Sequence, residues 1–383
     1  MIQIERGLIC VKNAGGKLKG YRLFTPGPID IPLDVLQATA HKCIYHREDK
    51  FRVLMDEITD MLKKVIDCHY RIYLLTSSGT GAMEAAYVNV ISNSDEIVVG
   101  VCGKFGERWV ELAQSYGKKP IIIKQEFGKP ITPEMFEQGL SQAKKPAVVF
   151  TTLTETSTGV VNDIKAINEV IKKYDGYLVV DGVAGIGADP FYLDKWNVDL
   201  IVGASQKALM APPGIAFVGI SERAFKKIKN SDTPKYYFNF NLYEKFLEKG
   251  QTPWTPAITI LYGLKKGLEK ITRMGIEKNF THHRKMAEYV RTRIKKMGYE
   301  LFSENPSNGL TVLKMPDGID STEIIKECKI KYGILFANGQ AEMRGKILRI
   351  GHMGNYNIKK LSQVIDILEM VMAKRIKTQN KRR

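Results

Sequence analysis

The chain has 383 residues, 44% of them hydrophobic and 26% charged, which is typical of a folded protein large enough for two domains. No apolar run approaches the roughly 18 residues of a membrane-spanning helix, and the N-terminus lacks the apolar core of a secretion signal. A formal net charge of +17 is compatible with nucleic-acid or anion binding, but the lysines are dispersed and only residues 373–383 form a basic block.

Between about residues 70 and 220, short apolar runs alternate with amphipathic segments of helical length. The runs read as buried strands at 72–79, 95–101, 120–125, 146–152, 177–183, 199–205 and 215–221. The segments between them read as helices at 82–92, 105–117, 132–143 and 163–176. This alternation predicts βαβ units and a mostly parallel seven-stranded sheet with helices on both faces.

The rest of the chain has a different pattern. Two long helices are expected at 257–275 and 277–298, and a mixture of strands and helices fills residues 309–383, ending in a helix near 361–376. We therefore expect an α/β fold with three parts. These are an N-terminal arm at 1–20, a large domain at 21–275 and a smaller α+β domain at 276–383.

Polar residues follow three of the predicted strands, and ligands of open parallel sheets bind beyond the carboxyl ends of the strands. The first strand is followed by Ser77-Ser78-Gly79-Thr80-Gly81 and then a helix. Small residues, hydroxyl groups and the free N–H groups of a helix N-terminus suit an anion. Taken alone, the segment fits an ordinary helix cap equally well.

An acid and an amine follow two further strands. Asp181 ends the run YLVVD, where a buried carboxylate needs a cation or a hydrogen-bond donor to stay ionised. A helix cap or a structural ion pair would also explain it. Lys207 follows the run DLIVGAS, and a desolvated amine there would be nucleophilic, although most lysines lie on the surface.

The three features together suit one cofactor. The phosphate of pyridoxal phosphate requires an anion site, its pyridine nitrogen a carboxylate and its aldehyde a lysine. The combination is far more specific than any of its parts.

With these residues in place, the sequence resembles the class V, fold-type I, pyridoxal-phosphate-dependent aminotransferases, and within them the alanine–glyoxylate and serine–pyruvate (serine–glyoxylate) group. The resemblance runs in family order from about residue 25 to 354. The matching stretches are TPGPIDIP, HREDKF, SSGTGAMEAAYVNV, CGKFGERW, TETSTGV, VDGVAGIG, GASQKALMAPPG, TPAITILYGL and LRIGHMG.

The resemblance implies a role for each matching position. Lys207 would form the internal aldimine, and Asp181 would keep the pyridine nitrogen protonated. Phe105 and Val183 would cover the two faces of the ring, and Thr156 would lie near its phenolic oxygen. The phosphate would be bound by Ser78, Gly79, Thr80 and Gln206, and by Thr255 of a second subunit in a homodimer.

The resemblance also implies the substrate contacts. Arg349 would bind the substrate carboxylate, because a guanidinium pairs with a carboxylate through two hydrogen bonds. Without the resemblance, the sequence around Arg349 would indicate only a surface arginine at a strand edge. Gly27, His46 and Arg47 would border the substrate pocket, whereas His282 and His283 are expected on the surface of a long helix.

The implied reaction is a ping-pong transamination in the cytoplasm. Serine or alanine would give its amino group, and pyruvate or glyoxylate would accept it. Aspartate or aminoethylphosphonate is an alternative donor, with Arg47 as a second cation. Two other classes of function stay open, a cysteine desulfurase and a basic nucleic-acid-binding protein. The sequence carries no sign of a metal site or a disulfide framework, because its five cysteines are scattered and include no CxxC pair (Cys10, Cys43, Cys68, Cys102, Cys328).

Overall fold

The computed structural model describes residues 2–5, 8–13, 16–17, 20–143 and 146–380. Within the predicted N-terminal arm, β1 (Ile2–Glu5), β2 (Leu8–Asn13) and β3 (Gly16–Lys17) form an antiparallel sheet. Residues 1, 6–7, 14–15 and 18–19 of the arm and the last three residues of the basic block lie outside the described residues.

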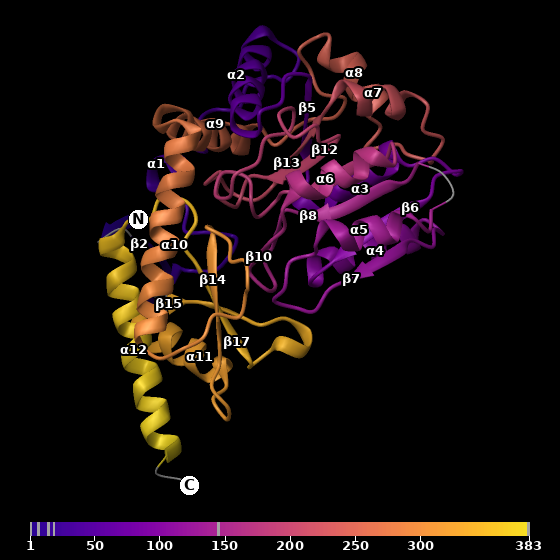
Figure 1. Cartoon of the computed structure of the whole chain (residues 1–383). Helices are drawn as coiled ribbons and strands as arrows, with labels where there is room; N and C mark the ends of the chain where they lie inside the picture. The colour runs from indigo at the N-terminus through magenta and orange to yellow at the C-terminus, as the bar shows by residue number, and fades with distance from the viewer. Residues whose placement is uncertain (1, 6–7, 14–15, 18–19, 144–145, 381–383) are drawn as a thin grey trace.

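A seven-stranded sheet forms the centre of the larger part of the molecule (Figure 1). Its spatial order is β5-β13-β12-β11-β8-β6-β7. The strands are β5 (Arg71–Thr76), β6 (Ile97–Val101), β7 (Ile121–Lys124), β8 (Val148–Thr152), β11 (Tyr177–Asp181), β12 (Leu200–Ala204) and β13 (Ile215–Ile220). All neighbours are parallel except β13, which is antiparallel to both β12 and β5. The predicted mostly parallel sheet of seven strands is confirmed.

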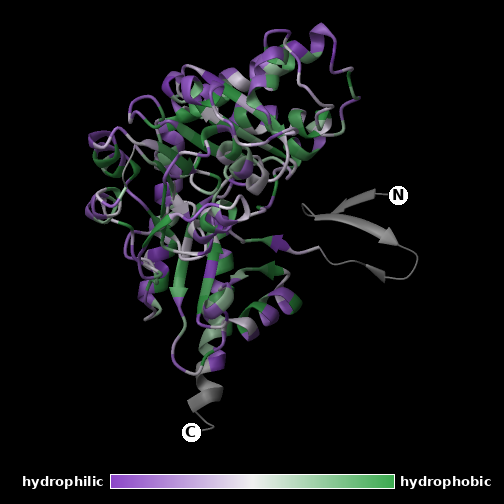
Figure 2. Ribbon diagram, turned by 90° about the vertical axis from the view of Figure 1, so that its right-hand side faces the viewer, coloured by the Kyte–Doolittle hydropathy of each residue, from purple (hydrophilic) through white to green (hydrophobic). Residues whose placement is uncertain are grey.

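Helices cover both faces of this sheet, because alternate residues of its strands point to opposite sides. In β11, Leu178 and Val180 join one hydrophobic cluster, whereas Val179 joins the other. The first face is covered by α2 (Asp49–Ile66), α5 (Pro133–Leu140), α6 (Ile164–Lys173) and α9 (Ile258–Met274). The second is covered by α3 (Gly79–Val90), α4 (Lys104–Ser115), α7 (Glu222–Lys229) and α8 (Phe240–Leu247). Figure 2 shows the hydrophobic strands enclosed between mixed, more polar helices.

The smaller part of the molecule has its own hydrophobic core. Its antiparallel sheet has the order β14-β17-β16, with β14 (Leu310–Lys314), β16 (Ala337–Asn338) and β17 (Ile347–Gly351). The helices are α10 (Ile276–Lys296), α11 (Ser321–Tyr332) and α12 (Ile358–Asn380), and α10 and α12 pack side by side (Figure 1). The short elements of the chain are β4 (Arg22–Leu23), α1 (Leu33–Ala38), β9 (Thr154–Glu155), β10 (Val160–Val161), β15 (Ile334–Leu335) and the 3-10 helix Ala341–Met343.

The segment after the arm is tied to the smaller part, although the sequence suggested that the large domain begins at residue 21. β4 pairs in parallel with β15, and the amide of Gly351 donates a hydrogen bond to the carbonyl of Phe24 at 2.7 Å. We call residues 21–28 the strap. It runs from the smaller part toward the edge of the large sheet, so both parts contribute to what lies between them.

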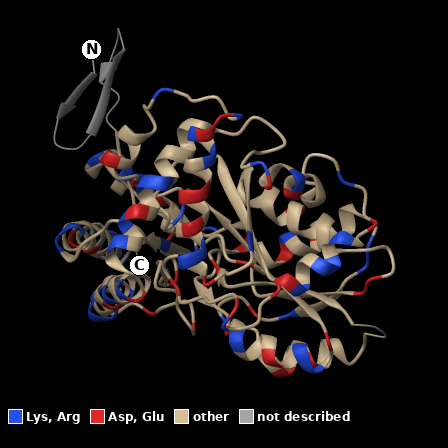
Figure 3. Ribbon diagram, turned by 90° about the horizontal axis from the view of Figure 1, so that it is seen from above, with Lys and Arg blue, Asp and Glu red and all other residues tan. Residues whose placement is uncertain are grey.

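Charged residues of both signs are interspersed over the helices, and Figure 3 shows lysine and arginine alternating with aspartate and glutamate. Many of them pair, as Lys227 does with Asp95 and Arg293 with Asp366. Among the described residues, no helix is long and apolar enough to cross a membrane.

Candidate active site

Three strands of the large sheet bring the predicted site residues to one edge. β11 and β12 are parallel neighbours, and β5 runs in the same direction because β13 is antiparallel to both β12 and β5. The carboxyl ends of these strands therefore lie at a common edge. Ser78, Asp181 and Lys207 follow or end these strands, so residues more than a hundred positions apart meet there.

Lys207 lies in the tight turn after β12. The hydroxyl of Ser205 donates to the carbonyl of Pro212 at 2.6 Å, which closes the turn. The amine of Lys207 donates to the carbonyl of Pro26, in the strap, at 2.8 Å. Burial lowers the pKa of Lys207 to about 8, even though the Asp181 carboxylate opposes this shift. A substantial fraction of this amine is therefore neutral near physiological pH, as a nucleophile or a base requires.

Asp181 is the last residue of β11 and is 5% exposed. One carboxylate oxygen accepts a hydrogen bond from the amide of Val183 at 2.9 Å. Burial raises the pKa of Asp181 to about 6, while the charges of Arg108 and Lys207 act in the opposite direction. Among the described residues it has no salt bridge, and only the more distant charges of Arg108 and Lys207 act on it, so this carboxylate is available to a buried cationic group.

The predicted anion site lies at the start of α3. Ser78 is the N-cap residue, and its side chain accepts a hydrogen bond from the amide of Gly81 at 3.4 Å. A Cβ atom on Gly79 would lie 2.8 Å from a methyl group of Val183, so only glycine allows this close approach. The side-chain oxygen of Gln206, the residue before Lys207, is buried and has no hydrogen-bond partner in the described part of the chain.

Arg108 also reaches this anion site, although the sequence reasoning did not identify it. Its guanidinium donates to the hydroxyl of Thr80 at 3.2 Å and lies 4.7 Å from the centre of the Phe105 ring. The signal in the sequence was the spacing, because Arg108 is three residues after Phe105 in α4 and therefore on the same helix face.

A buried carboxylate, also missed from the sequence, fixes the start of α4. Glu155 is fully buried and accepts hydrogen bonds from the amides of Phe105 at 3.0 Å and Gly106 at 2.9 Å. Its other oxygen accepts from the amide and hydroxyl of Ser157. Gly103, the N-cap residue of α4, offers no side chain, so Glu155 takes over the capping from a neighbouring segment. This orients the Phe105 ring.

Arg349 lies in β17, the central strand of the small sheet, and is 7% exposed. The expectation for a surface arginine at a strand edge is therefore wrong, because β14 and β16 flank β17 on both sides. Its Nε donates to the carbonyl of Asn338 at 2.8 Å and its Nη1 to the carbonyl of Thr156 at 3.0 Å. Burial lowers the pKa of Arg349 to about 10, opposed by the charge of Glu155.

A cavity of about 420 Å³ is lined by five of the predicted site residues, Gly27, Phe105, Thr156, Lys207 and Arg349, together with other residues. It is lined by Tyr21, Leu23, Thr25, Pro26, Gly27, Pro28, Phe105, Thr156, Lys207, Leu335, Ala337, Gln340 and Arg349. The strap, the large sheet and the small sheet all contribute walls. The cavity therefore places an amine, a guanidinium and an aromatic ring around one small space.

The other predicted site residues do not line this cavity: Ser78, Gly79, Thr80, Asp181, Val183, Gln206, His46, Arg47 and Thr255. Arg47 donates to the side chain of Gln251 at 2.8 Å and to the carbonyl of Thr252 at 3.1 Å, so it holds the loop before Thr255. His46 packs edge-on against Phe51. Thr255 is exposed on that loop, and its contact with a second subunit stays a prediction.

The expectation of a surface position for His283 is wrong, whereas His282 is half-buried. His283 is 1% exposed, with Nδ1 2.8 Å from the carbonyl of Asn279 and Nε2 accepting from the amide of Gly354 at 3.0 Å. Burial lowers its pKa to about 4. The amphipathic pattern of α10 could not reveal this, because the covering loop comes from 70 residues further along the chain.

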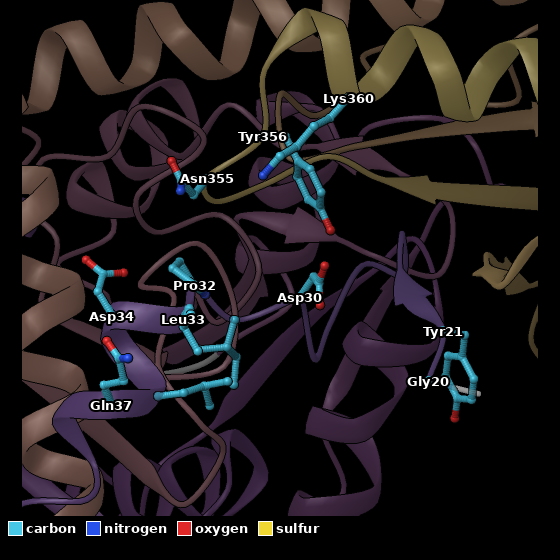
Figure 4. Close-up of a pocket in the computed structure, with 12 residues that line it drawn as sticks. Gly20, Tyr21, Asp30, Pro32, Leu33, Asp34, Gln37, Asn355, Tyr356 and Lys360 are labelled. Carbon is cyan, nitrogen blue, oxygen red and sulfur yellow. The ribbon is translucent and has the colours of Figure 1, made fainter. Parts of the chain in front are cut away.

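A second cavity, of about 660 Å³, lies beside the start of α1 and the segment before α12 (Figure 4). Figure 4 shows Asp30, Asp34 and Lys360 among its lining residues. Asp34 is paired with Lys270 at 2.6 Å. This cavity shares only Tyr21 with the cavity at Lys207 and contains none of the predicted site residues. In the described part of the chain, no group of His, Cys, Asp and Glu side chains could hold a metal ion.

Comparison with known proteins finds relatives over most of the chain. A family model described as "Aminotransferase class-V" matches residues 33–360. An uncharacterized aminotransferase of Methanocaldococcus jannaschii is 36% identical over 91% of this chain and 92% of its own length. The L-aspartate–glyoxylate aminotransferase of Paracoccus denitrificans is 31% identical over 92% of this chain and 91% of its own.

Two further relatives have names that give serine or alanine, rather than aspartate, as the amino donor. The serine–glyoxylate aminotransferase of Methylorubrum extorquens is 31% identical over 91% of this chain and 90% of its own. Among solved structures, the alanine–glyoxylate aminotransferase of Nostoc sp. superposes with a TM-score of 0.90 at 30% identity, covering 94% of this chain and 98% of that one. The expected fold is thereby confirmed.

Proposed function

The chain belongs to the class V aminotransferase family, and on that premise we propose that it binds pyridoxal phosphate and transfers the amino group of serine or alanine to glyoxylate or pyruvate. The observation that carries the proposal is the cavity in which the amine of Lys207, the ring of Phe105 and the guanidinium of Arg349 face one space.

The residues at the sheet edge fit pyridoxal phosphate group by group. The start of α3 offers N–H groups and hydroxyls to a phosphate, and the side-chain amide of Gln206, whose oxygen has no partner among the described residues, would donate an N–H to it. Asp181 is a buried carboxylate without an ion pair, which suits a protonated ring nitrogen. Phe105 and Val183 would cover the two ring faces. When bound, the cofactor supplies an aldehyde and an electron-withdrawing ring that stabilises negative charge on the substrate Cα.

Lys207 is suited to move a proton at the substrate Cα. Its lowered pKa, about 8, leaves the amine able to accept a proton at neutral pH and return it. The carbonyl of Pro26 gives the amine a fixed hydrogen-bond acceptor at the cavity wall. Asp181 would keep a bound cofactor's ring nitrogen protonated, and residues of the strap and Leu335 of β15 form part of the cavity wall.

Arg349 would orient the substrate by its carboxylate. Two of its nitrogens are fixed by main-chain carbonyls, so the guanidinium plane is held before the substrate arrives. The walls beside it include Leu23, Leu335 and Ala337, which favour a small side chain over a second carboxylate. Because one relative is named an aspartate–glyoxylate aminotransferase, aspartate is also tested as an amino donor.

The cysteine desulfurase alternative is disfavoured by Cys328. This cysteine of the smaller part is buried in α11, and burial raises the pKa of its thiol to about 12. A desulfurase needs an accessible thiolate. We further propose a homodimer, with Thr255 of a second copy completing the phosphate site, which analytical ultracentrifugation would test.

The function is tested by adding serine, alanine and aspartate separately to the protein with pyridoxal phosphate, with glyoxylate or pyruvate as acceptor. We expect a visible absorbance band and faster turnover with serine or alanine than with aspartate. Lys207→Ala should lose both the band and turnover, whereas Lys119→Ala, at an exposed lysine, should keep them. A wild-type protein that binds no pyridoxal phosphate would refute the proposal.

A further inference from the structure

The residues assigned to the phosphate carry no positive charge. Ser78, Gly79 and Thr80 offer only N–H and hydroxyl groups, and Gln206 and Thr255 are also neutral. A phosphate monoester carries a charge of about −1.5 to −2 at neutral pH. Lys207 is committed to the aldehyde, so a cation for the phosphate must come from elsewhere.

Arg108 places a positive charge beside the N-terminus of a helix, where a positive charge is unfavourable. Its Nη1 lies 3.2 Å from the hydroxyl of Thr80, in the first turn of α3. The N-terminus of a helix carries partial positive charge, which repels a guanidinium and attracts an anion. The proximity of the Arg108 guanidinium to the N-terminus of α3 is therefore electrostatically unfavourable unless an anion contacts both groups.

In the described part of the chain, no carboxylate forms a salt bridge with Arg108, and its neighbour Glu107 is already paired with Lys104. Arg108 is nevertheless held in place, because its guanidinium lies 4.7 Å from the centre of the Phe105 ring and its side chain is partly buried. Its charge also acts on both Asp181 and Lys207, lowering the pKa of each. The positive charge of Arg108 thus contacts the start of α3 and acts electrostatically on the two residues at the strand ends.

We propose that Arg108 is the cationic ligand of the cofactor phosphate, acting from α4 across the start of α3. This inference rests on the proposed function, because it assumes that pyridoxal phosphate is the cofactor. In this role the guanidinium and the helix N-terminus of α3 bind the same anion from two sides, and the contact with Phe105 couples phosphate binding to the position of the aromatic ring.

The test compares two ligands that differ only in the phosphate. The apoprotein is titrated with pyridoxal phosphate and, separately, with pyridoxal, by following absorbance and fluorescence. In Arg108→Gln we expect the affinity for pyridoxal phosphate to fall about 10- to 100-fold, the range of a lost charged hydrogen bond, and the affinity for pyridoxal to change less than about threefold. Arg108→Lys should recover part of the loss. Inorganic phosphate should compete with pyridoxal phosphate more weakly in Arg108→Gln than in wild type.

The matched control is Lys104→Gln, which removes a positive charge from the same helix without touching Thr80. It should leave both affinities unchanged, and circular dichroism of each apoprotein checks that it is folded. Equal losses for both ligands in Arg108→Gln would overturn the inference, because Arg108 would then act only by supporting Phe105. Unchanged affinities would also overturn it, and so would an effect confined to the KM of aspartate, which would assign Arg108 to a substrate carboxylate. Failure of the wild type to bind pyridoxal phosphate would instead refute the proposed function.

Discussion

The amine of Lys207 donates a hydrogen bond to the main-chain carbonyl of Pro26, 2.8 Å away and 181 residues earlier in the chain. The strap that carries Pro26 is held by the smaller part of the molecule, through β15 and through the amide of Gly351. The lysine of the large sheet is thus positioned against a segment that the small domain holds. Four predictions concern this arrangement and the residues around it.

Gly27→Ala should prevent attachment of the cofactor to Lys207. Gly27 has a φ of +126°, and a Cβ atom there would lie 2.4 Å from both Cδ and Nζ of Lys207. We expect the fraction of cofactor trapped on the protein by borohydride to fall at least about tenfold, since the amine must move. Gly298→Ala is the control, because Gly298 also has a positive φ, +82°, but open space around it. Wild-type trapping in Gly27→Ala would contradict the prediction.

Asp181→Asn should stabilise the apoprotein and weaken cofactor binding. Because folding raises the pKa of Asp181 from 3.8 to about 6, the folded state binds more protons than the unfolded state between these pH values, and stability falls as pH rises through that window. Asparagine removes this penalty, on the order of 3 kcal/mol above pH 6. Urea unfolding of both apoproteins should show the difference at pH 8 and little of it at pH 4.

The same variant should bind pyridoxal phosphate at least about tenfold more weakly, because it offers no charge to the ring nitrogen. Asp60→Asn, at an exposed position of α2, should change neither property. An apoprotein of Asp181→Asn that is less stable than wild type at pH 8 would contradict the burial argument, and unchanged cofactor affinity would contradict the role.

Arg349→Lys should raise the KM for both the amino donor and the 2-oxo acid by about 10- to 100-fold. Lysine cannot reproduce the guanidinium plane that the carbonyls of Asn338 and Thr156 hold. Steady-state kinetics with serine and glyoxylate measure the effect, and Arg344→Lys, at an exposed arginine, is the control. Ethanolamine, which is serine without its carboxylate, should react equally slowly with wild type and Arg349→Lys. A difference between them would show that Arg349 does not act on the carboxylate.

Glu155→Gln should destabilise the protein by about 2–4 kcal/mol. Both oxygens of the Glu155 carboxylate accept hydrogen bonds, whereas the amide nitrogen of glutamine is a donor and would face another donor. Urea unfolding measures the loss. Glu126→Gln, at a surface glutamate paired with Lys129, should leave stability unchanged within the error of the measurement. Since Glu155 positions Phe105, the visible circular dichroism of the bound cofactor should also change in Glu155→Gln only. Stability and spectra like those of wild type would refute this role.

Much of the fold was predictable from local patterns. The seven apolar runs became the seven strands of the large sheet, because buried parallel strands need continuous apolar sequence. The alternation with helices placed the ends of β5, β11 and β12 at one edge, and this put Ser78, Asp181 and Lys207 together before any coordinates were known. The antiparallel direction of β13 was not readable, since hydrophobic runs have no direction.

What the sequence determined by itself was therefore chemical type and strand order along the chain, including the lysine, the acid and the small residues at three strand ends. Tertiary structure alone decided the contacts between distant segments: the strap carbonyl at Lys207, the burial of Arg349 and His283, the capping of α4 by Glu155 and the reach of Arg108 to Thr80. The physical reason is that hydrophobic periodicity reports only which face of an element is buried. Which polar group that face meets depends on packing between segments up to several hundred residues apart.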